Sequence, residues 1–113
     1  MAMMNMNVEQ FNLNTQGKSP ALVEFMAPWC VYCRRIAPAL GKVAEQYGGG
    51  LIFAQVNIDK EPGLARQERI EVAPTFVLYR GGQAVGSMVA PDSKGQIEAF
   101  LQAHLGRRGE GNE

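Results

Sequence analysis

A chain of 113 residues, of which 46% are hydrophobic and 19% charged, is long enough for one compact domain with a hydrophobic core and too short for two. Eleven Lys and Arg residues balance eleven Asp and Glu residues, so the formal net charge is zero, which argues against a general binder of nucleic acid or of anionic membrane surfaces. We therefore expect residues 1–106 to form a single domain whose partners are not polyanions.

The N-terminal stretch MAMMNMNVEQ is rich in methionine but has neither a basic region nor a long apolar segment, so it is not typical of a signal peptide. Nowhere do about 18 apolar residues run together, so the sequence predicts no membrane span. We expect a soluble, cytoplasmic protein. In that reducing compartment a lone pair of cysteines is not expected to form a permanent structural disulfide.

Residues 21–27 (ALVEFMA) form an apolar run of strand length that is interrupted by Glu24, which predicts a buried central strand. The segment 30–47 predicts a helix that begins at the cysteines and ends before the glycines of 48–50. Pro38 lies inside this helix, and a kink is expected there.

The later elements follow in chain order: a strand over 51–59, a short helix over 62–70, two strands within 75–89 and a helix over 92–105. Gly81 and Gly82 join the two strands, and Asp92 or Ser93 is expected to cap the last helix. The polar residues 107–113 are predicted to be a disordered tail. Alternating strands and helices predict an α/β domain with a central mixed sheet flanked by helices.

Both cysteines lie in the segment WCVYC, where the predicted central strand gives way to the predicted helix. At the first turn of a helix, free backbone N–H groups and the helix dipole favour an anion, so the pKa of the Cys30 thiol is expected to be lowered. Cys33 would lie one turn further on the same side and be more buried. This asymmetry predicts that Cys30 attacks a disulfide and that Cys33 resolves the mixed disulfide.

A pair of cysteines can also bind a metal or include a protease nucleophile. A zinc site needs four protein ligands, and this chain supplies two cysteines and the distant His104, so zinc or an iron–sulfur cluster would have to bridge two copies. A cysteine protease needs a positioned histidine, and His104 is far along the chain. We therefore expect neither a metal nor a cofactor.

The chain resembles the thioredoxin family over residues 3–105. The landmarks that carry the resemblance, in order, are LVEFMAPWCVYCRRIAPAL, VNID, VAPTF, the Gly81–Gly82 hairpin and SKGQIEAFL. The resemblance implies a thioredoxin fold and a thiol–disulfide oxidoreductase that reduces protein disulfides. It further implies a monomer that receives electrons from a reductase similar to thioredoxin reductase.

The resemblance also implies roles for single residues. Cys30 corresponds to the nucleophile of the family, Cys33 to the resolving cysteine, and Trp29 to the aromatic flank of the active site. Pro74 matches the proline that the family holds in cis beside the thiols, and Ala73 before it would offer backbone groups to an extended substrate.

The residues between the cysteines differ from those of the family. Thioredoxins usually have Gly-Pro there and glutaredoxins often have Pro-Tyr, whereas this chain has Val31 and Tyr32. Without the proline a backbone N–H can point at the thiolate, which predicts a less reducing protein. Tyr32 could narrow access to Cys30, stack on a substrate, or be exposed without a role. Ala90, followed by a proline, replaces a glycine-containing loop that borders the substrate groove in the family.

Glu24 is a carboxylate in an otherwise apolar strand, where burial is costly unless the acid is paired or protonated. The family carries a buried aspartate at this position, and it shuttles the proton of the resolving cysteine. The family often places a lysine opposite this acid, but this chain has Gln55. We therefore expect a raised Glu24 pKa and proton exchange with Cys33 near neutral pH. Alternatively, the Glu24 carboxylate reaches solvent at the strand end.

A rival function of another class is a binding module. Its groove would be formed by Trp29, Ala73, Pro74 and Ala90, and its thiols would be dispensable, because a fold does not determine its function.

Overall fold

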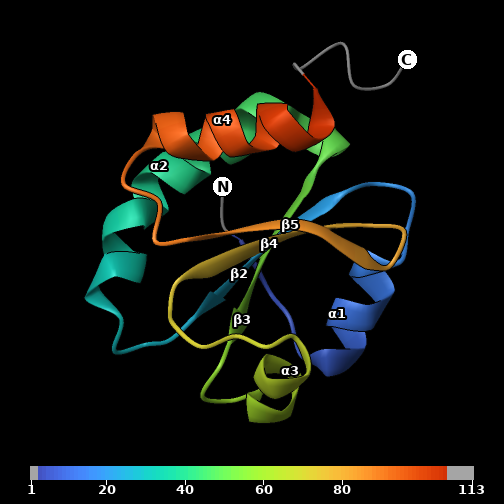
Figure 1. Cartoon of the computed structure of the whole chain (residues 1–113), viewed down its shortest axis with the longest axis vertical. Coiled ribbons are helices and arrows are strands. Elements are labelled where there is room, and N and C mark those ends of the chain that lie inside the picture. Colours follow the sequence, from blue (N-terminus) through green and yellow to red (C-terminus); the bar gives the residue numbers. More distant parts are fainter. Residues whose placement is uncertain (1–2, 107–113) are drawn as a thin grey trace.

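A mixed five-stranded sheet organises the chain in the computed structural model, which describes residues 3–106 (Figure 1). The strands lie side by side in the order β1 (Met4–Asn5), β3 (Ile52–Asn57), β2 (Ala21–Met26), β4 (Thr75–Arg80) and β5 (Gln83–Val89). The central strand β2 runs parallel to β3 and antiparallel to β4. The predicted α/β architecture with a central mixed sheet is therefore confirmed. The predicted tail, residues 107–113, lies outside the described residues.

Helices cover both faces of this sheet. They are α1 (Val8–Thr15), α2 (Val31–Tyr47), α3 (Pro62–Gln67) and α4 (Lys94–Leu105), with a short 3-10 helix, η1 (Gly48–Gly50), after α2. Helices α2 and α4 pack on one face, and α1 and α3 on the other (Figure 1). Among residues 3–106, none of the helices combines the length and the hydropathy that crossing a membrane requires.

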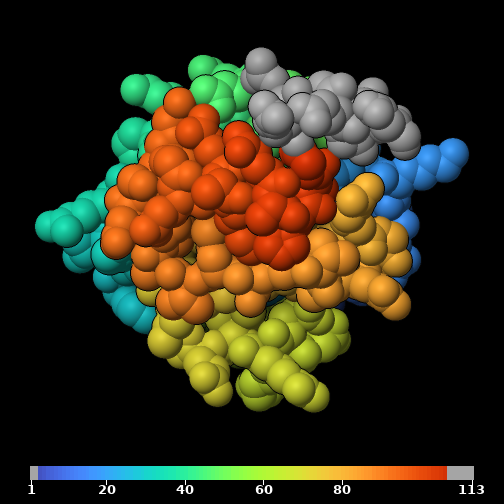
Figure 2. Space-filling model, turned by 45° about the horizontal axis from the view of Figure 1, so that its top comes forward, coloured from blue at the N-terminus to red at the C-terminus, as the bar shows by residue number. Residues whose placement is uncertain are grey.

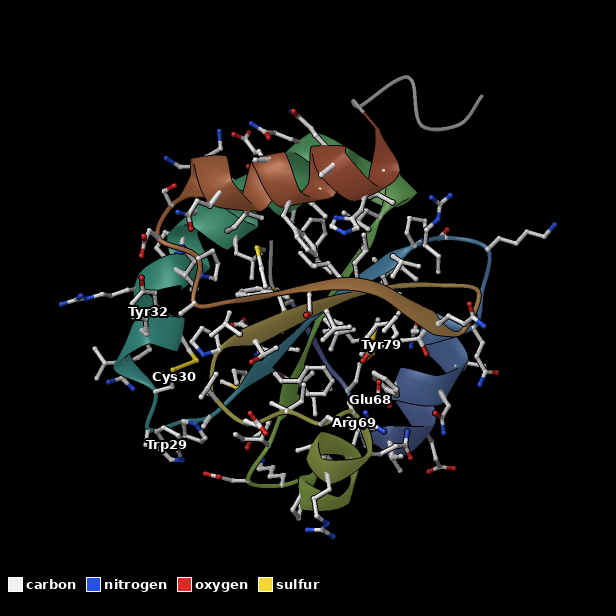
Figure 3. The ribbon with its side chains drawn as sticks, in the orientation of Figure 1. Trp29, Cys30, Tyr32, Glu68, Arg69 and Tyr79 are labelled. Atoms are coloured by element: carbon white, nitrogen blue, oxygen red, sulfur yellow. A yellow bond between two sulfur atoms is a disulfide. The ribbon has the colours of Figure 1, made fainter. Side chains whose placement is uncertain are left out.

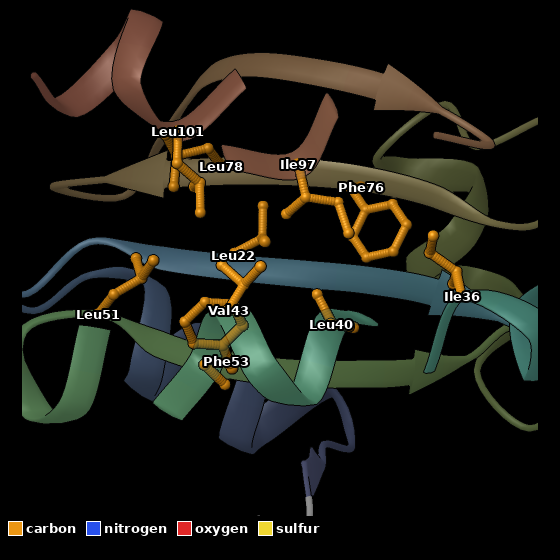
Figure 4. Packing of buried hydrophobic residues seen from close by; sticks show 11 residues of the cluster. Leu22, Ile36, Leu40, Val43, Leu51, Phe53, Phe76, Leu78, Ile97 and Leu101 are labelled. Carbon is orange, nitrogen blue, oxygen red and sulfur yellow. The ribbon is translucent and has the colours of Figure 1, made fainter. Parts of the chain in front are cut away.

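The larger part of the core lies between the sheet and the helices α2 and α4 (Figure 4). The side chains that meet there include Leu22 of β2, Leu40 and Val43 of α2, and Ile97 and Leu101 of α4. Successive side chains of a strand point to opposite faces, so Glu24 shares the face of Leu22 and lies under α2. This alternation places a carboxylate below the helix that begins at the cysteines.

The opposite face of β2 is buried as well. Ala21, Val23 and Phe25 pack into a second cluster with Phe11 of α1 and Leu64 of α3. A strand that is covered on both faces needs apolar residues at successive positions, which explains the nearly continuous apolar run of β2.

The element boundaries largely follow the predictions. Helix α2 begins directly after Cys30, and the β4–β5 turn is made by Gly81 and Gly82, whose φ angles of 58° and 82° suit glycine. Ser93, not Asp92, caps α4, because its hydroxyl accepts the N–H of Gln96. Helix α3 ends at Gln67 and not at residue 70.

Helix α1 and strand β1 are not predicted from the sequence. Helix α1 buries only Phe11 and Thr15, so its hydrophobic periodicity is weak, and β1 has two residues. One local signal was present: the Asn7 side chain accepts the N–H of Gln10, and the Gln10 side chain accepts the N–H of Asn7. Such a reciprocal capping box marks a helix start in sequence.

The packing of α2 on the sheet is tested by Leu40→Ala. The Leu40 side chain of α2 is 1% exposed and lies in the core between α2 and the sheet. Its truncation should lower the free energy of unfolding by about 2 to 5 kcal/mol. Leu13→Ala is the matched control, because Leu13 is 78% exposed and its loss should cost less than about 0.5 kcal/mol. Urea denaturation of the oxidised proteins gives both values, and equal losses would contradict this account of the core.

Candidate active site

The two cysteines form a disulfide at the N-terminus of α2 (Figure 3). Cys30 is the N-cap residue, with extended backbone angles, and Cys33 is three positions further. The N-cap side chain of a helix accepts the backbone N–H of the third helical residue, and here the Cys33 N–H donates to the Cys30 Sγ at 3.0 Å. The Cys30 sulfur therefore lies at the positive end of the helix dipole, as predicted.

Both cysteines are nearly covered. Cys30 is 4% exposed and Cys33 is 5% exposed, so the prediction that Cys33 is the more buried of the two is wrong. The reason is tertiary: Tyr32 and Ala73 pack against the cluster that the cysteines form with Ala27. The turn of the helix alone would have left Cys30 more open.

The expected donor to the Cys30 sulfur is also different. The missing proline predicts that an N–H of the insert, the two residues Val31 and Tyr32 between the cysteines, points at the thiolate, but the donor is the N–H of Cys33. A thioredoxin with Gly-Pro between its cysteines has this N–H too. The effect of the insert on the reduction potential therefore stays a prediction.

Trp29 and Val31 flank Cys30 in the chain. They are 64% and 57% exposed, so both chain neighbours of Cys30 present a large apolar side chain to solvent. The Trp29 Nε1–H donates to the Asp59 carboxylate at 3.0 Å, and this bond orients the indole. The sequence did not mark Asp59 as a site residue, although it closes the VNID landmark, which begins in the last residues of β3.

Pro74 lies beside the thiol pair, as the resemblance implied. The Ala73–Pro74 peptide bond is cis, and Ala73 packs against the cysteine cluster. Because β4 and β5 pair antiparallel, the residue after β5 returns to the start of β4, and the Ala90 N–H donates to the Pro74 carbonyl at 3.0 Å. The segment around Ala90 therefore borders the same end of the sheet as the disulfide.

The Tyr32 side chain forms a hydrogen bond with a residue far away in the sequence. Its hydroxyl donates to the Asp92 carboxylate at 2.6 Å, across 60 positions of sequence. This hydrogen bond raises the pKa of Tyr32 above its ordinary value. For Asp92 the sequence predicts only a role as helix cap, so this contact is not predicted from the sequence.

Glu24 lies behind Cys33, on the side of the thiol pair that faces the sheet. Both residues line a cavity of about 380 Å³, together with Met26, Ala37 and Gln55. Glu24 is 3% exposed, so the alternative in which its carboxylate reaches solvent is wrong. The Glu24 carboxylate and Cys33 therefore border a common space.

The surroundings of Glu24 favour its neutral form. Its buried Oε2 has no hydrogen-bond partner within residues 3–106. Gln55 pairs with Glu24 in the parallel register, but its side-chain amide donates to Asn5 at 2.5 Å. Burial raises the pKa of Glu24 from an ordinary 4.5 to about 7, in agreement with the expected direction.

The one histidine of the chain lies elsewhere. His104 belongs to the last turn of α4, where its ring stacks near Phe100 and covers Gly86 in the middle of β5. A cysteine protease of the usual kind would need it beside Cys30. Among the described residues, no three His, Cys, Asp or Glu side chains are grouped so that they could hold a metal ion.

Comparison with known proteins gives one consistent result. The family model described as Thioredoxin matches residues 2–103. Thioredoxin 1 of Nostoc sp. is 40% identical over 86 residues, which cover 76% of this chain and 80% of that protein. A thioredoxin of Alicyclobacillus acidocaldarius is 36% identical over 100 residues, which cover 88% of this chain and 95% of that protein.

A chloroplast relative is also similar. The M-type thioredoxin of Zea mays is 34% identical over 89 residues, which cover 79% of this chain and 53% of that protein. The family match spans nearly the whole chain and includes the Cys30–Cys33 pair, the cis Pro74 and the acid beneath them. The chain therefore belongs to the thioredoxin family.

Proposed function

We propose that this thiol–disulfide oxidoreductase acts as a reductant of protein disulfides through Cys30 and Cys33. The observation that carries the proposal is the Cys30–Cys33 pair at the N-terminus of α2, where the Cys30 sulfur accepts the Cys33 N–H. In the reduced protein this N–H and the helix dipole stabilise a thiolate, which is the nucleophilic form.

The reaction proceeds by two exchanges. The Cys30 thiolate attacks one sulfur of the substrate disulfide, a Cys30–substrate disulfide forms, and the other substrate sulfur leaves as a thiolate. The Cys33 thiol loses its proton and attacks the Cys30 sulfur, which releases the second substrate thiolate and forms the Cys30–Cys33 disulfide. The dithiol has then supplied two electrons.

Glu24 is proposed to accept the proton of Cys33. Its carboxyl shares a cavity with Cys33, and its pKa of about 7 lets it both take and return a proton near neutral pH. Neither Trp29 nor Val31 lines this cavity, so proton exchange and substrate binding can use different residues around the thiol pair.

An extended substrate chain is proposed to lie along the edge formed by Ala73 and Pro74. Trp29 and Val31 would contact its apolar side chains, since both are exposed beside the disulfide. Tyr32 and Ala90 would border the chain on the side of α4.

The wider setting is proposed from the sequence and the family. Residues 1–106 act as one domain and as a monomer in the cytoplasm, with electrons supplied by a reductase similar to thioredoxin reductase. A formal net charge of zero supports protein partners over nucleic acid.

Cysteine substitutions test the two exchanges. Cys30→Ser should lower the reduction of insulin disulfides to the rate of dithiothreitol alone, because the attacking sulfur is lost. Cys33→Ser should instead trap a substrate on Cys30, since the mixed disulfide cannot be resolved, and mass spectrometry should detect the adduct. The rival function, a binding module, predicts another result. A variant that combines Cys30→Ser with Cys33→Ser would then keep the biological activity of the wild-type protein.

Glu24→Gln tests the raised carboxyl pKa. The folded protein holds the Glu24 proton more tightly than the unfolded chain, so this residue makes the protein most stable below pH 4.5 and less stable as the pH rises toward about 7. The loss over this window is on the order of 3 kcal/mol, because one pKa unit corresponds to about 1.4 kcal/mol. Glu24→Gln should remove this fall.

The comparison is made by urea denaturation of the oxidised proteins, in which the cysteines do not titrate. Glu71→Gln is the control, because Glu71 is exposed. A wild-type protein whose stability does not fall over this pH range would contradict a buried, unpaired Glu24.

The reduction potential tests the effect of the insert. Without a proline before Cys33, we expect a value above the thioredoxin value of about −270 mV, within the range of about −230 to −120 mV that extends from glutaredoxins to strong oxidants. The fluorescence of Trp29, the one tryptophan, reports the equilibrium with glutathione. A double variant, Val31→Gly with Tyr32→Pro, should move the potential toward about −270 mV. A wild-type value at or below that level would refute the expectation.

A further inference from the structure

Tyr32 connects two parts of the site that are far apart in sequence. It lies in the first turn of α2, between the cysteines, and its hydroxyl donates to Asp92 in the segment before α4. Figure 2 shows this segment, in orange, beside the blue-green start of α2 at one edge of the face formed by α4 and β5. The contact therefore joins the insert to the segment that ends the β-hairpin.

The Asp92 end of this contact is held in place. The Asp92 N–H donates to the Gln96 side chain at 2.7 Å, and the neighbouring Ser93 caps α4. Two positions before Asp92, the Ala90 N–H donates to the Pro74 carbonyl. The backbone that bears the Asp92 carboxylate is thus hydrogen-bonded to α4, and the nearby Ala90 is hydrogen-bonded to Pro74.

The ring of Tyr32 packs against the cluster of Ala27, Cys30 and Cys33. Cys30 is 4% exposed, although its sulfur has to meet a second sulfur atom in each exchange. A hydrogen bond at the far end of the ring keeps the ring on this cluster. A partner sulfur atom can then approach the disulfide only from the sides that the Tyr32 ring leaves uncovered.

We propose that the Tyr32–Asp92 hydrogen bond is a clasp that makes Tyr32 a specificity-determining residue. It closes the side of the disulfide that faces α4, so that a partner sulfur reaches Cys30 along the Ala73–Pro74 edge. This arrangement favours an extended polypeptide over small disulfides. The inference rests on the proposed reduction of protein disulfides and adds a selection among its substrates.

The selectivity follows from the direction of approach. A polypeptide that lies along Ala73 and Pro74 reaches Cys30 from the open edge, whether or not the clasp is intact. A small disulfide has no such edge to follow and can react from any uncovered side. Breaking the clasp therefore uncovers a second route that only the small substrate gains.

The test compares two substrates of the reduced protein, the uncharged small disulfide bis(2-hydroxyethyl) disulfide and insulin. Tyr32→Phe keeps the ring and removes the hydroxyl, and Asp92→Ala removes the acceptor. Each should raise kcat/KM for the small disulfide about two- to tenfold, the factor that corresponds to one net hydrogen bond. Any change in kcat/KM for insulin should be smaller than the rise for the small disulfide, so the preference for insulin falls.

Two further variants separate the hydrogen bond from other effects. Asp92→Asn keeps an oxygen that can accept the Tyr32 hydroxyl but removes the charge, so it should retain the wild-type preference. Tyr79→Phe removes another tyrosine–carboxylate bond of 2.6 Å, to Glu68, at the end of the sheet away from the cysteines (Figure 3). It should leave the preference unchanged even if it lowers stability. Reduction potentials are measured for all variants, so that a change in driving force is recognised.

The outcomes are distinct. An unchanged preference in Tyr32→Phe and Asp92→Ala would overturn the clasp, and so would an Asp92→Asn variant that behaves like Asp92→Ala, since the charge would then be responsible. A parallel rise for both substrates would show a general opening and would also overturn the selection. A wild-type protein that reduces neither substrate would refute the proposed function itself, and the clasp with it.

Discussion

The packing of α2 on the central strand β2 is the constraint on which the site depends. Leu40 and Val43 pack against Leu22, and this contact determines where the first turn of α2 lies along β2 and which side of that turn faces the sheet. Cys30 at the N-cap and Cys33 one turn later then face each other over the end of β2. A helix dipole stabilises an anion only near its first turn, so a shift of α2 along the strand would remove the sulfur from that position.

The same packing encloses Glu24. Two apolar neighbours of the acid in β2, Val23 and Phe25, point away into the other core cluster, while Glu24 points at α2. The desolvation of the carboxylate opposes folding at neutral pH, because the raised pKa measures how much the charged form is disfavoured. The core on both faces of β2 has to supply the stability that offsets this cost. Under the proposed function, the proton of this acid is exchanged with Cys33, with which it shares a cavity.

The hairpin completes the site from the other side. Antiparallel pairing of β4 with β5 returns the chain from Val89 to the level of Thr75, and the backbone contact between Ala90 and Pro74 joins the two ends. The segment that leads into β4 and the start of α2, which are far apart in sequence, then both contact the disulfide: Ala73 and Tyr32 pack against the cysteine cluster. Three segments therefore meet at the site: the start of α2, the segment that leads into β4 and the residue that follows β5. The sheet positions each of them.

The sequence by itself determined the cysteine pair, the central strand with its buried acid and the helix that begins at the cysteines, because each depends on spacing within a few residues; the position of the acid beneath the cysteines was implied by the resemblance to the family. Only the tertiary structure decided the equal burial of Cys30 and Cys33, the bond from Trp29 to Asp59 and the bond from Tyr32 to Asp92. These contacts join segments 30 and 60 positions apart, and their existence depends on how α2, β3 and the end of the hairpin pack together. Local patterns carry no information on that packing, since a polar side chain on a loop looks the same in sequence whether it meets water or a tyrosine hydroxyl.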